Sequence, residues 1–308
     1  MGIGRSLLLA AAKSDTLNRI ATQSRIVKRA TRAFMPGERM DDGLDAGATI
    51  ARTGRALLYT RLGEALTQSH ESVAVRDHYL ALFDAIKQRG LPGQVSVKPT
   101  QLGLDLSMDE CAQHLVALAD KAESTGSSLW LDMEDATYVD RTLDLYRTIR
   151  ARHARAGLAL QAYLYRTPND VEALLPLAPT IRLVKGAYAE SAAVAFPQKR
   201  DTDAAYEQSS FQMLEGAKRN SCTPIFGTHD MPLLRRIIAK AGALGVPKGK
   251  YEIHMLFGIR DRDQLTLMRE GETIATLISY GEAWYRWYMR RLAERPANVA
   301  FVVKSMFT

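Results

Sequence analysis

Charged side chains stand at the ends of short apolar segments in this sequence. Lys98 ends the segment QVSVK, and Asp132 lies near the end of the segment SLWLDM. A charge inside an apolar strand is costly unless it is paired, so these residues form either a structural ion pair or a polar, positively charged face for a ligand. The same DMED stretch contains Glu134 and Asp135, which are possible metal ligands. No histidine with suitable spacing accompanies them, and the sequence therefore favours a role other than metal binding.

The segment RLVKGAY, residues 182–188, combines two cations, a glycine and an aromatic ring. Arg182 and Lys185 are three positions apart, so they project from opposite faces of a strand unless the chain bends. Gly186 permits such a bend and a close approach of the backbone to a ligand. This combination suits an anionic cofactor with a planar ring. The alternative is a strand end whose charges are solvated.

The segment FGTHD, residues 226–230, places the Thr228 hydroxyl and the His229 imidazole at the end of another apolar segment. A single histidine more often forms structural hydrogen bonds than takes part in catalysis. The sequence has no GxSxG motif, and no Ser-His-Asp triad is expected.

Two adjacent arginines lie within the aromatic segment WYRWYMRRLAERP, residues 284–296. At about 100° per residue, its apolar side chains cover a broad arc of a helix that includes Arg291, with Arg290 just beyond the edge. A guanidinium in such surroundings requires an anion. The two arginines could converge with Lys98 on one small carboxylate, or they could reach solvent past the rings of a surface helix.

Eight short apolar segments alternate with segments of helical pattern, and this order predicts a parallel sheet. Eight such units indicate an α/β fold of the (β/α)8 TIM-barrel type. The GxGxxG motif that would indicate a Rossmann fold does not follow the first predicted strand. The helical segments 139–157 and 231–245 are expected to end at their glycines, Gly157 and Gly245. The predicted strands are residues 56–62, 94–98, 128–133, 158–164, 180–185, 223–228, 251–256 and 273–279.

Polar residues occur at or near every predicted strand end, where a barrel of this type carries its chemistry. Their recurrence in register predicts one polar site at the carboxyl end of the barrel. They are Glu64, Lys98, Asp132, Gln161, Arg182, Lys185, Thr228, His229, His254 and Tyr280.

Charge is concentrated at the amino terminus. The chain has 308 residues, 46% of them hydrophobic, and a formal net charge of +7. Residues 1–40 contain eight Lys or Arg against Asp15 and Glu38, so nearly all of the net charge lies there. We predict a basic helical arm over residues 1–45 and a catalytic barrel over residues 46–308. The arm could bind an anionic membrane surface or nucleic acid, or it could be a solvated helix.

The cellular location is also constrained by the sequence. Cys111 and Cys222 provide neither a disulfide framework nor a CxxC metal motif. No uninterrupted apolar run reaches the about 18 residues that a membrane-spanning helix needs. These features predict a cytoplasmic protein, with peripheral contact at the inner face of the cell membrane.

Long motifs between residues 50 and 305 resemble those of the proline dehydrogenase family in its monofunctional bacterial form. The motifs are VSVKPTQLGLDLS, WLDMEDATYVD, QAYLYRT, RLVKGAY, GTHD, MLFGIR and YGEAWYRWYMRRLAERPAN. The resemblance implies a (β/α)8 barrel with FAD at the carboxyl ends of its strands and a final helix over the barrel mouth. It also implies oxidation of L-proline to 1-pyrroline-5-carboxylate, with hydride transfer to flavin N5 and reoxidation by a membrane quinone.

The resemblance assigns substrate contacts to residues of these motifs. Lys98, Arg290 and Arg291 would bind the substrate carboxylate, and Asp132 would hold the lysine. Glu64 would pair with Arg290 and close the site over the substrate. The substrate pocket would also be lined by Leu256 and Tyr188.

The resemblance assigns a second set of residues to the flavin. Arg182 would lie near flavin N5 and stabilise the reduced, anionic flavin. The other flavin contacts would be Gln161, Lys185, Gly186, Ala187, Thr228 and His229.

One position departs from the family pattern. The family usually carries a tyrosine four residues before the glycine that opens the last helix, and this sequence has Leu277 before Gly281. Relatives that prefer 4-hydroxyproline also lack the tyrosine. L-Proline stays the favoured substrate, with 4-hydroxyproline or another cyclic amino acid as the alternative. Three other classes stay open: a folate-linked flavin reductase, a metal-dependent barrel hydrolase, and a basic membrane- or nucleic-acid-binding protein.

Overall fold

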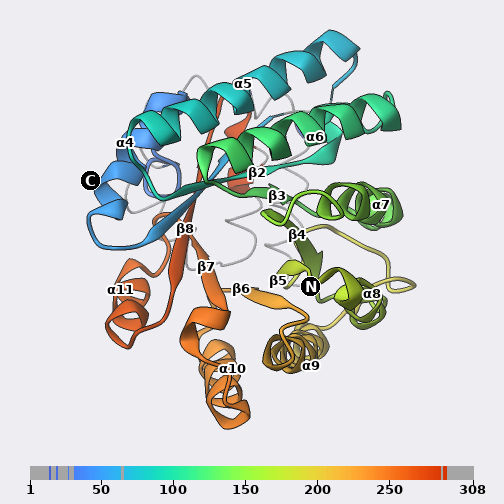
Figure 1. Ribbon diagram of the computed structural model, residues 1–308, viewed down its shortest axis with the longest axis vertical. Coiled ribbons are helices and arrows are strands. Elements are labelled where there is room, and N and C mark those ends of the chain that lie inside the picture. Colours follow the sequence, from blue (N-terminus) through green and yellow to red (C-terminus); the bar gives the residue numbers. More distant parts are fainter. Residues whose placement is uncertain are drawn as a thin grey trace.

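Eight parallel strands close into a barrel in the order β1 to β8, with β8 hydrogen-bonded to β1 (Figure 1). The structure is a computed structural model that describes residues 14, 19, 27, 31–63, 66–285 and 287–289. The strands are β1 Ala56–Arg61, β2 Gly93–Val97, β3 Leu129–Leu131, β4 Ala156–Gln161, β5 Thr180–Val184, β6 Thr223–Gly227, β7 Glu252–Leu256 and β8 Ile274–Tyr280.

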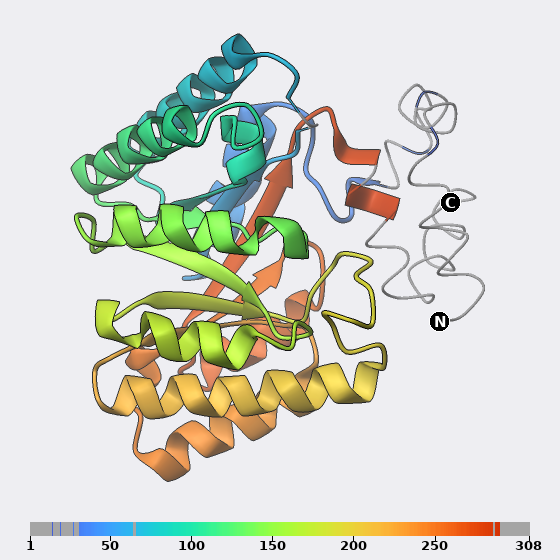
Figure 2. The ribbon, with the colours of Figure 1, turned by 90° about the vertical axis from the view of Figure 1, so that its right-hand side faces the viewer.

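Helices surround the barrel (Figures 1 and 2). The α-helices are α4 Met40–Ala51, α5 Ser69–Gln88, α6 Met108–Thr125, α7 Val139–Arg150, α8 Thr167–Leu174, α9 Lys199–Lys218, α10 Met231–Leu244 and α11 Asp261–Arg269. The short 3-10 helices are η1 Pro99–Leu102, η2 Ala136–Tyr138, η3 Leu175–Leu177 and η4 Lys248–Lys250.

The strands separate two apolar cores because their side chains alternate between the two faces of the sheet. Outward-facing residues such as Leu57, Val95 and Leu131 are buried in one continuous core beneath the helices. Each fully buried leucine or valine side chain stabilises the fold by about 1.5–3 kcal/mol. The barrel interior holds a smaller cluster of Leu58, Trp130, Ile225 and Leu277.

The eight-stranded barrel predicted from the sequence is confirmed, with strand bounds that differ by up to three residues. The assignment of Gly157 to a helix end is wrong. Helix α7 ends at Arg150, and Gly157 lies within β4 opposite Trp130. A Cβ atom at Gly157 would lie 2.5 Å from the Cε3 atom of Trp130, so the close approach of this ring requires a glycine.

Helix α10 is capped at both ends. The Asp230 carboxylate accepts a hydrogen bond from the backbone N–H of Leu233 at 3.3 Å and caps the helix. Gly245 adopts the left-handed conformation, with φ of 72°, just after the last helical residue. The prediction that this helix ends at Gly245 is confirmed, and the cap fixes the segment between β6 and α10.

The aromatic segment near the carboxyl terminus packs into a cluster of its own. Trp284, Tyr285 and Tyr288 are buried together with Phe34 and Met35. In Figure 2 the residues that follow β8 continue to the side of the barrel toward which the strands point. The predicted burial of the aromatic arc is therefore confirmed for these three rings.

Several sequence predictions fall on residues outside the described part of the chain. They include Glu64, Arg290 and Arg291, most of the basic arm, and the placement of the final helix over the barrel mouth. The predicted boundary after residue 45 falls within α4, and the division into arm and barrel stays a prediction. Among the described residues, no helix is long and apolar enough to cross a membrane.

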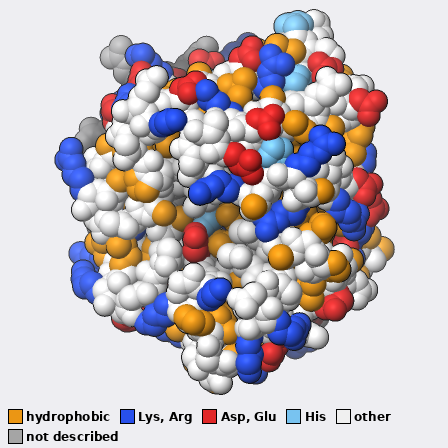
Figure 3. Space-filling view, viewed as in Figure 1, with side chains coloured by type: hydrophobic (Ala, Val, Ile, Leu, Met, Phe, Trp, Pro, Cys, Tyr) orange, Lys and Arg blue, Asp and Glu red, His pale blue; other side chains and the backbone are white. Residues whose placement is uncertain are grey.

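The surface carries both signs of charge. The face of the barrel seen in Figure 3 shows basic and acidic side chains interspersed, without a continuous patch of one sign. Many of these charges form exposed ion pairs, such as Arg147 with Asp144 at 2.8 Å.

Candidate active site

A charged network joins three strands at the carboxyl end of the barrel. Asp132 follows β3, and its Oδ1 accepts a hydrogen bond from the Ser96 hydroxyl of β2 at 2.7 Å. The same oxygen forms an ion pair with Arg182 of β5, whose Nη2 also donates to Ser96 Oγ at 3.0 Å. Lys98 Nζ lies 3.8 Å from Asp132 Oδ2.

The predicted pairing of Lys98 with Asp132 is present, but Arg182 is the closer partner of the carboxylate. At 3.8 Å the Lys98 ammonium is beyond ordinary hydrogen-bond distance from Asp132. Its side chain is 20% exposed. Lys98 is therefore placed to bind a second anion, whereas Asp132 chiefly balances the charge of Arg182.

Arg182 is a buried cation inside the barrel. The residue is 5% exposed, and burial lowers the pKa of its guanidinium while the charge of Asp132 opposes that shift. Its Cζ atom lies 5.0 Å from the centroid of the Trp130 ring, which is a cation–π distance. Within the described part of the chain, its Nη1 atom has no hydrogen-bond partner. A buried donor without a partner marks a position where a polar ligand group can be accommodated.

Lys185 projects away from Arg182, as the spacing of the two residues predicts. Its Nζ contacts Asp230 Oδ2 at 2.8 Å and also pairs with Asp203 of α9. These contacts connect the end of β5 to α9 and to the cap of α10. Burial raises the pKa of the Asp230 carboxyl, but the hydrogen bonds from Lys185 and from the Leu233 N–H, together with the charges of Lys185 and Lys199, outweigh it, so the pKa is lowered.

The bend after β5 depends on Gly186. Its φ angle is 123°, a value that L-residues with side chains rarely adopt. A Cβ atom there would also lie 2.5 Å from Cγ of the Tyr163 ring. Ala187 and Tyr188 follow, both partly buried, in the segment that leads to α9. This segment therefore has a defined course close to the barrel.

His229 and Leu256 are joined by a hydrogen bond between the ends of β6 and β7. The backbone N–H of Leu256 donates to His229 Nε2 at 2.9 Å. Because a backbone N–H can only donate, Nε2 has no proton, and a neutral His229 ring carries its proton on Nδ1. The imidazole is thus oriented as a donor through Nδ1. The adjacent Thr228 is buried, and its hydroxyl accepts a hydrogen bond from the Asp230 N–H at 3.2 Å.

Gln161 ends β4 inside the barrel and is 2% exposed. Its Nε2 donates to the backbone oxygen of Met133 at 3.5 Å, a long contact. Its Oε1 has no partner among the residues that the structure describes. Gln161 and Arg182 thus present one buried acceptor and one buried donor that remain available to a ligand.

Leu256 and Leu277 are neighbours in the barrel interior. The two residues are paired in register between β7 and β8. Leu277 is partly buried and packs against the interior cluster that contains Trp130. An apolar surface therefore adjoins the charged network of Lys98, Asp132 and Arg182.

Two residues of this site were not recognised in the sequence. Ser96 bridges Asp132 and Arg182, and Trp130 lies against Arg182. Strand alternation provides a signal for both, because Ser96 precedes Lys98 by two positions and Trp130 precedes Asp132 by two. Each therefore shares the inward face of its strand with a charged residue.

The acidic residues of the DMED stretch have structural contacts. Glu134 is buried, and its two carboxylate oxygens accept hydrogen bonds from the Thr100 N–H at 3.1 Å and the Thr100 hydroxyl at 2.8 Å. Burial raises the pKa of Glu134, an effect that the hydrogen bonds from Thr100 and the charge of Lys98 oppose. Asp135 caps η2 by accepting from the Thr137 N–H at 3.0 Å. Glu134 thus anchors the turn that begins immediately after Lys98.

The family model described as proline dehydrogenase matches residues 44–304 of this chain. The protein named proline dehydrogenase 1 from Bacillus subtilis strain 168 is 33% identical over 303 residues, which cover 98% of each chain. Proline dehydrogenase 2 of the same strain is 34% identical over 306 residues and 99% of each chain. The proline dehydrogenase of Deinococcus radiodurans is 33% identical over 311 residues, covering 98% of this chain and 97% of its own length.

Solved structures with the same fold include proline utilization A, PutA, from Bdellovibrio bacteriovorus inactivated by N-propargylglycine. Its TM-score is 0.81 at 21% identity, and the match covers 93% of this chain but 38% of that one. A PutA variant from Bradyrhizobium japonicum matches with a TM-score of 0.75 at 22% identity, covering 96% of this chain and 34% of its own. The chain thus spans little more than a third of these larger proteins, and at this identity they establish the fold alone.

Proposed function

This chain belongs to the proline dehydrogenase family, and we propose that it oxidises L-proline to 1-pyrroline-5-carboxylate with FAD as its cofactor. The observation that carries the proposal is the charged network of Lys98, Asp132 and Arg182 at the carboxyl end of the barrel. It lies within the matched region, beside the apolar surface of Leu256 and Leu277. A cyclic amino acid combines the carboxylate and the apolar ring that such a site would bind.

Several residues of the site have the chemistry to hold a flavin. Gln161 Oε1 and Arg182 Nη1 are buried polar atoms without partners in the described residues, and His229 is oriented as a donor. Gly186 allows the backbone to bend where a side chain would not fit. When bound, FAD supplies the acceptor for the hydride that leaves the ring carbon beside the proline nitrogen. We propose Gln161, Arg182, Lys185, Gly186, Ala187, Thr228 and His229 as its contacts.

The substrate carboxylate is proposed to bind Lys98 together with Arg290 and Arg291. Asp132 is already bound by Arg182 and Ser96, so Lys98 is the cation with the weaker internal pairing. Tyr188, Leu256 and Leu277 would enclose the ring, and Glu64 would pair with Arg290. These contacts would hold the substrate in a fixed orientation relative to the hydride acceptor. Such positioning provides a large part of the rate enhancement in reactions of this kind.

The cations also affect the substrate nitrogen. Positive charge near an amine disfavours its protonated form and lowers its pKa. The neutral amine is the form that can release hydride from the adjacent carbon; the nitrogen then loses its proton, and the neutral imine product forms. The overall oxidation removes two electrons and two hydrogens from the ring. The electrons are proposed to pass from the enzyme to a membrane quinone.

The colour of the purified protein tests the proposal. A flavoprotein is yellow, and we expect its visible absorbance to bleach under anaerobic conditions when L-proline is added. Titration with 4-hydroxyproline in parallel determines whether the substitution at Leu277 has shifted substrate preference. A colourless preparation, or a yellow one that NADH bleaches and L-proline does not, would contradict the proposed function.

A further inference from the structure

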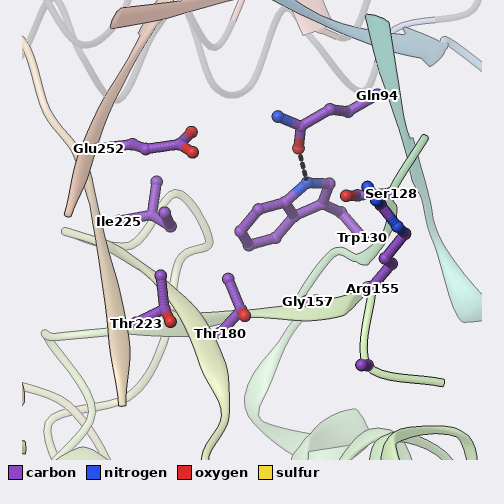
Figure 4. A pocket seen from close by; sticks show the side chains of 10 residues that line it. Gln94, Ser128, Trp130, Arg155, Gly157, Thr180, Thr223, Ile225 and Glu252 are labelled. Carbon is purple, nitrogen blue, oxygen red and sulfur yellow. Dashed lines mark hydrogen bonds between the residues drawn. The ribbon is translucent and has the colours of Figure 1, made fainter. Parts of the chain in front are cut away.

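Trp130 occupies the middle of the barrel, directly beside the candidate active site. It lies in β3, is 2% exposed, and packs against Leu58 and Ile225 in the interior cluster. Its indole N–H donates to Gln94 Oε1 at 2.5 Å, so the ring has a fixed orientation (Figure 4). The ring of His254 meets it edge-on, with centroids 5.4 Å apart. These contacts hold the indole on several sides.

The register of the strands places Trp130 one layer below Arg182. Trp130 is paired with Gly157 of β4, and Arg182 is paired with Ala159, two residues further along the same strand. The Arg182 guanidinium lies over the indole at 5.0 Å. Its Nη2 is held by Asp132 and Ser96. Asp132 and Ser96 thus hold one edge of the guanidinium, the indole lies against its face, and Nη1 has no partner among the described residues.

A cavity lies on the side of Trp130 away from the candidate active site. Its volume is about 200 Å³, and the residues that begin β5, β6 and β7 lie around it, namely Thr180, Thr223 and Glu252. In Figure 4 the Trp130 ring extends into this space from β3, with Glu252 across from it. Trp130 therefore separates the amino-end cavity from the buried Arg182.

We propose that Trp130 is a positioning residue that holds the Arg182 guanidinium over its ring and excludes the contents of the amino-end cavity from that cation. This inference rests on the proposed function, in which Arg182 contacts the flavin, and on the role that the family resemblance implies for its charge, which is to stabilise the reduced, anionic flavin. A cation fixed in a dry site interacts more strongly with a developing anion than a mobile, hydrated one. Trp130 would thus govern hydride transfer without contacting the substrate.

Substitution of Trp130 tests the role of the aromatic face. We would prepare full-length Trp130→Phe, Trp130→Leu and Trp130→Ala proteins with FAD and follow anaerobic bleaching by L-proline in a stopped-flow instrument. Trp130→Leu, which has no π face, should bleach at least about tenfold more slowly at saturating proline, because a mobile, hydrated Arg182 stabilises the developing negative charge less than a fixed one does. Trp130→Phe retains the face and should stay within about threefold of the parent. The half-saturating proline concentration should change little, because Lys98 is untouched.

Added indole provides a second measurement in the Trp130→Ala protein. That substitution joins the existing cavity to the space left by the ring, and engineered apolar cavities bind small aromatic molecules. Indole should therefore increase the bleaching rate of Trp130→Ala severalfold and leave the parent unchanged. Phe226→Ala is the matched control, because Phe226 is a fully buried ring on the outer face of β6, next to Tyr251. It should lower the unfolding midpoint, retain the parental bleaching rate and show no response to indole.

The outcomes separate the two proposals. A parent that binds no flavin, or is not bleached by L-proline, would refute the proposed function itself. A parent that is bleached, beside a Trp130→Leu protein that bleaches equally fast, would overturn the role of Trp130 alone. The same conclusion would follow if Trp130→Phe were as slow as Trp130→Leu, or if indole failed to accelerate Trp130→Ala.

Discussion

At the scale of single residues, the main consequence of the structure is that one carboxylate lies between two cations and pairs closely with only one of them. Asp132 pairs with the buried Arg182 and lies near Lys98. The sequence identified each of these three residues but not the closer pair. Arg182 lies in β5 and Asp132 directly follows β3, and these two strands are not adjacent, so the two residues meet only across the barrel interior. The sequence around each residue therefore could not predict that Arg182 and Asp132 form the closer pair.

Replacing Asp132 by asparagine should destabilise the protein. The substitution leaves Arg182 buried with no anion, and breaking a buried ion pair in this way costs about 3–5 kcal/mol. Urea denaturation of both proteins would measure the loss of unfolding free energy. Asp144→Asn is the control, because its ion pair with Arg147 is exposed and should contribute less than about 1 kcal/mol. Equal losses in the two variants would show that Asp132 does not balance a buried charge.

At the scale of secondary-structure elements, the sequence predicted the eight strands because apolar segments and helical patterns alternate regularly. It failed at Gly157, where a glycine that resembles a helix end is required inside β4 by the Trp130 ring. The bond from Leu256 to His229 was also beyond prediction, because it joins two strand ends through a backbone donor. Contacts of this kind depend on tertiary packing and have no local signature.

Helix α5 is joined to the end of β8 by His78, and we predict that this histidine makes the stability of the protein depend on pH. His78 Nε2 lies 2.8 Å from the Tyr280 hydroxyl, and burial, assisted by the charge of Arg61, lowers the His78 pKa to about 4. The unfolded chain takes up this proton near the ordinary value of about 6.5, before the folded protein does. The free energy of unfolding should therefore decrease as the pH falls from about 6.5 to about 4.

Urea denaturation at pH 7 and pH 5 would measure this effect. His78→Gln should show a smaller loss of stability between the two pH values than the parent. His70→Gln is the matched control, because His70 lies on the same helix with an exposed side chain. Identical pH dependence in the parent and in His78→Gln would exclude His78 as the source.

At the scale of the whole molecule, the charge is unevenly distributed along the chain. Nearly all of the formal net charge of +7 comes from residues 1–40. If the enzyme delivers electrons to a membrane quinone, a basic segment would attract it to anionic lipid. We predict binding to vesicles that contain anionic phospholipid, and weaker binding as the salt concentration rises, because screening shortens the range of the attraction.

Deletion of residues 1–30 provides the comparison for vesicle binding. It removes six basic residues and one acidic residue but retains Phe34 and Met35, which pack against the aromatic segment. The truncated protein should stay in the supernatant when vesicles are sedimented, while its activity toward soluble electron acceptors is retained. Sedimentation of the truncated protein with vesicles at the parental level would rule out this function of the basic segment.

The central claim is that cations at the carboxyl end of the barrel bind the carboxylate of a cyclic amino acid. Its most direct test is the proline concentration that half-saturates anaerobic flavin bleaching in the parent and in Lys98→Met. The variant should require at least about tenfold more proline, because a hydrogen bond to a charged group contributes about 1.5–3 kcal/mol. Pyrrolidine has the ring but no carboxylate. Its half-saturating concentration should therefore differ little between the parent and Lys98→Met. If dilute L-proline bleaches Lys98→Met as readily as the parent, Lys98 does not bind the substrate and the account is wrong.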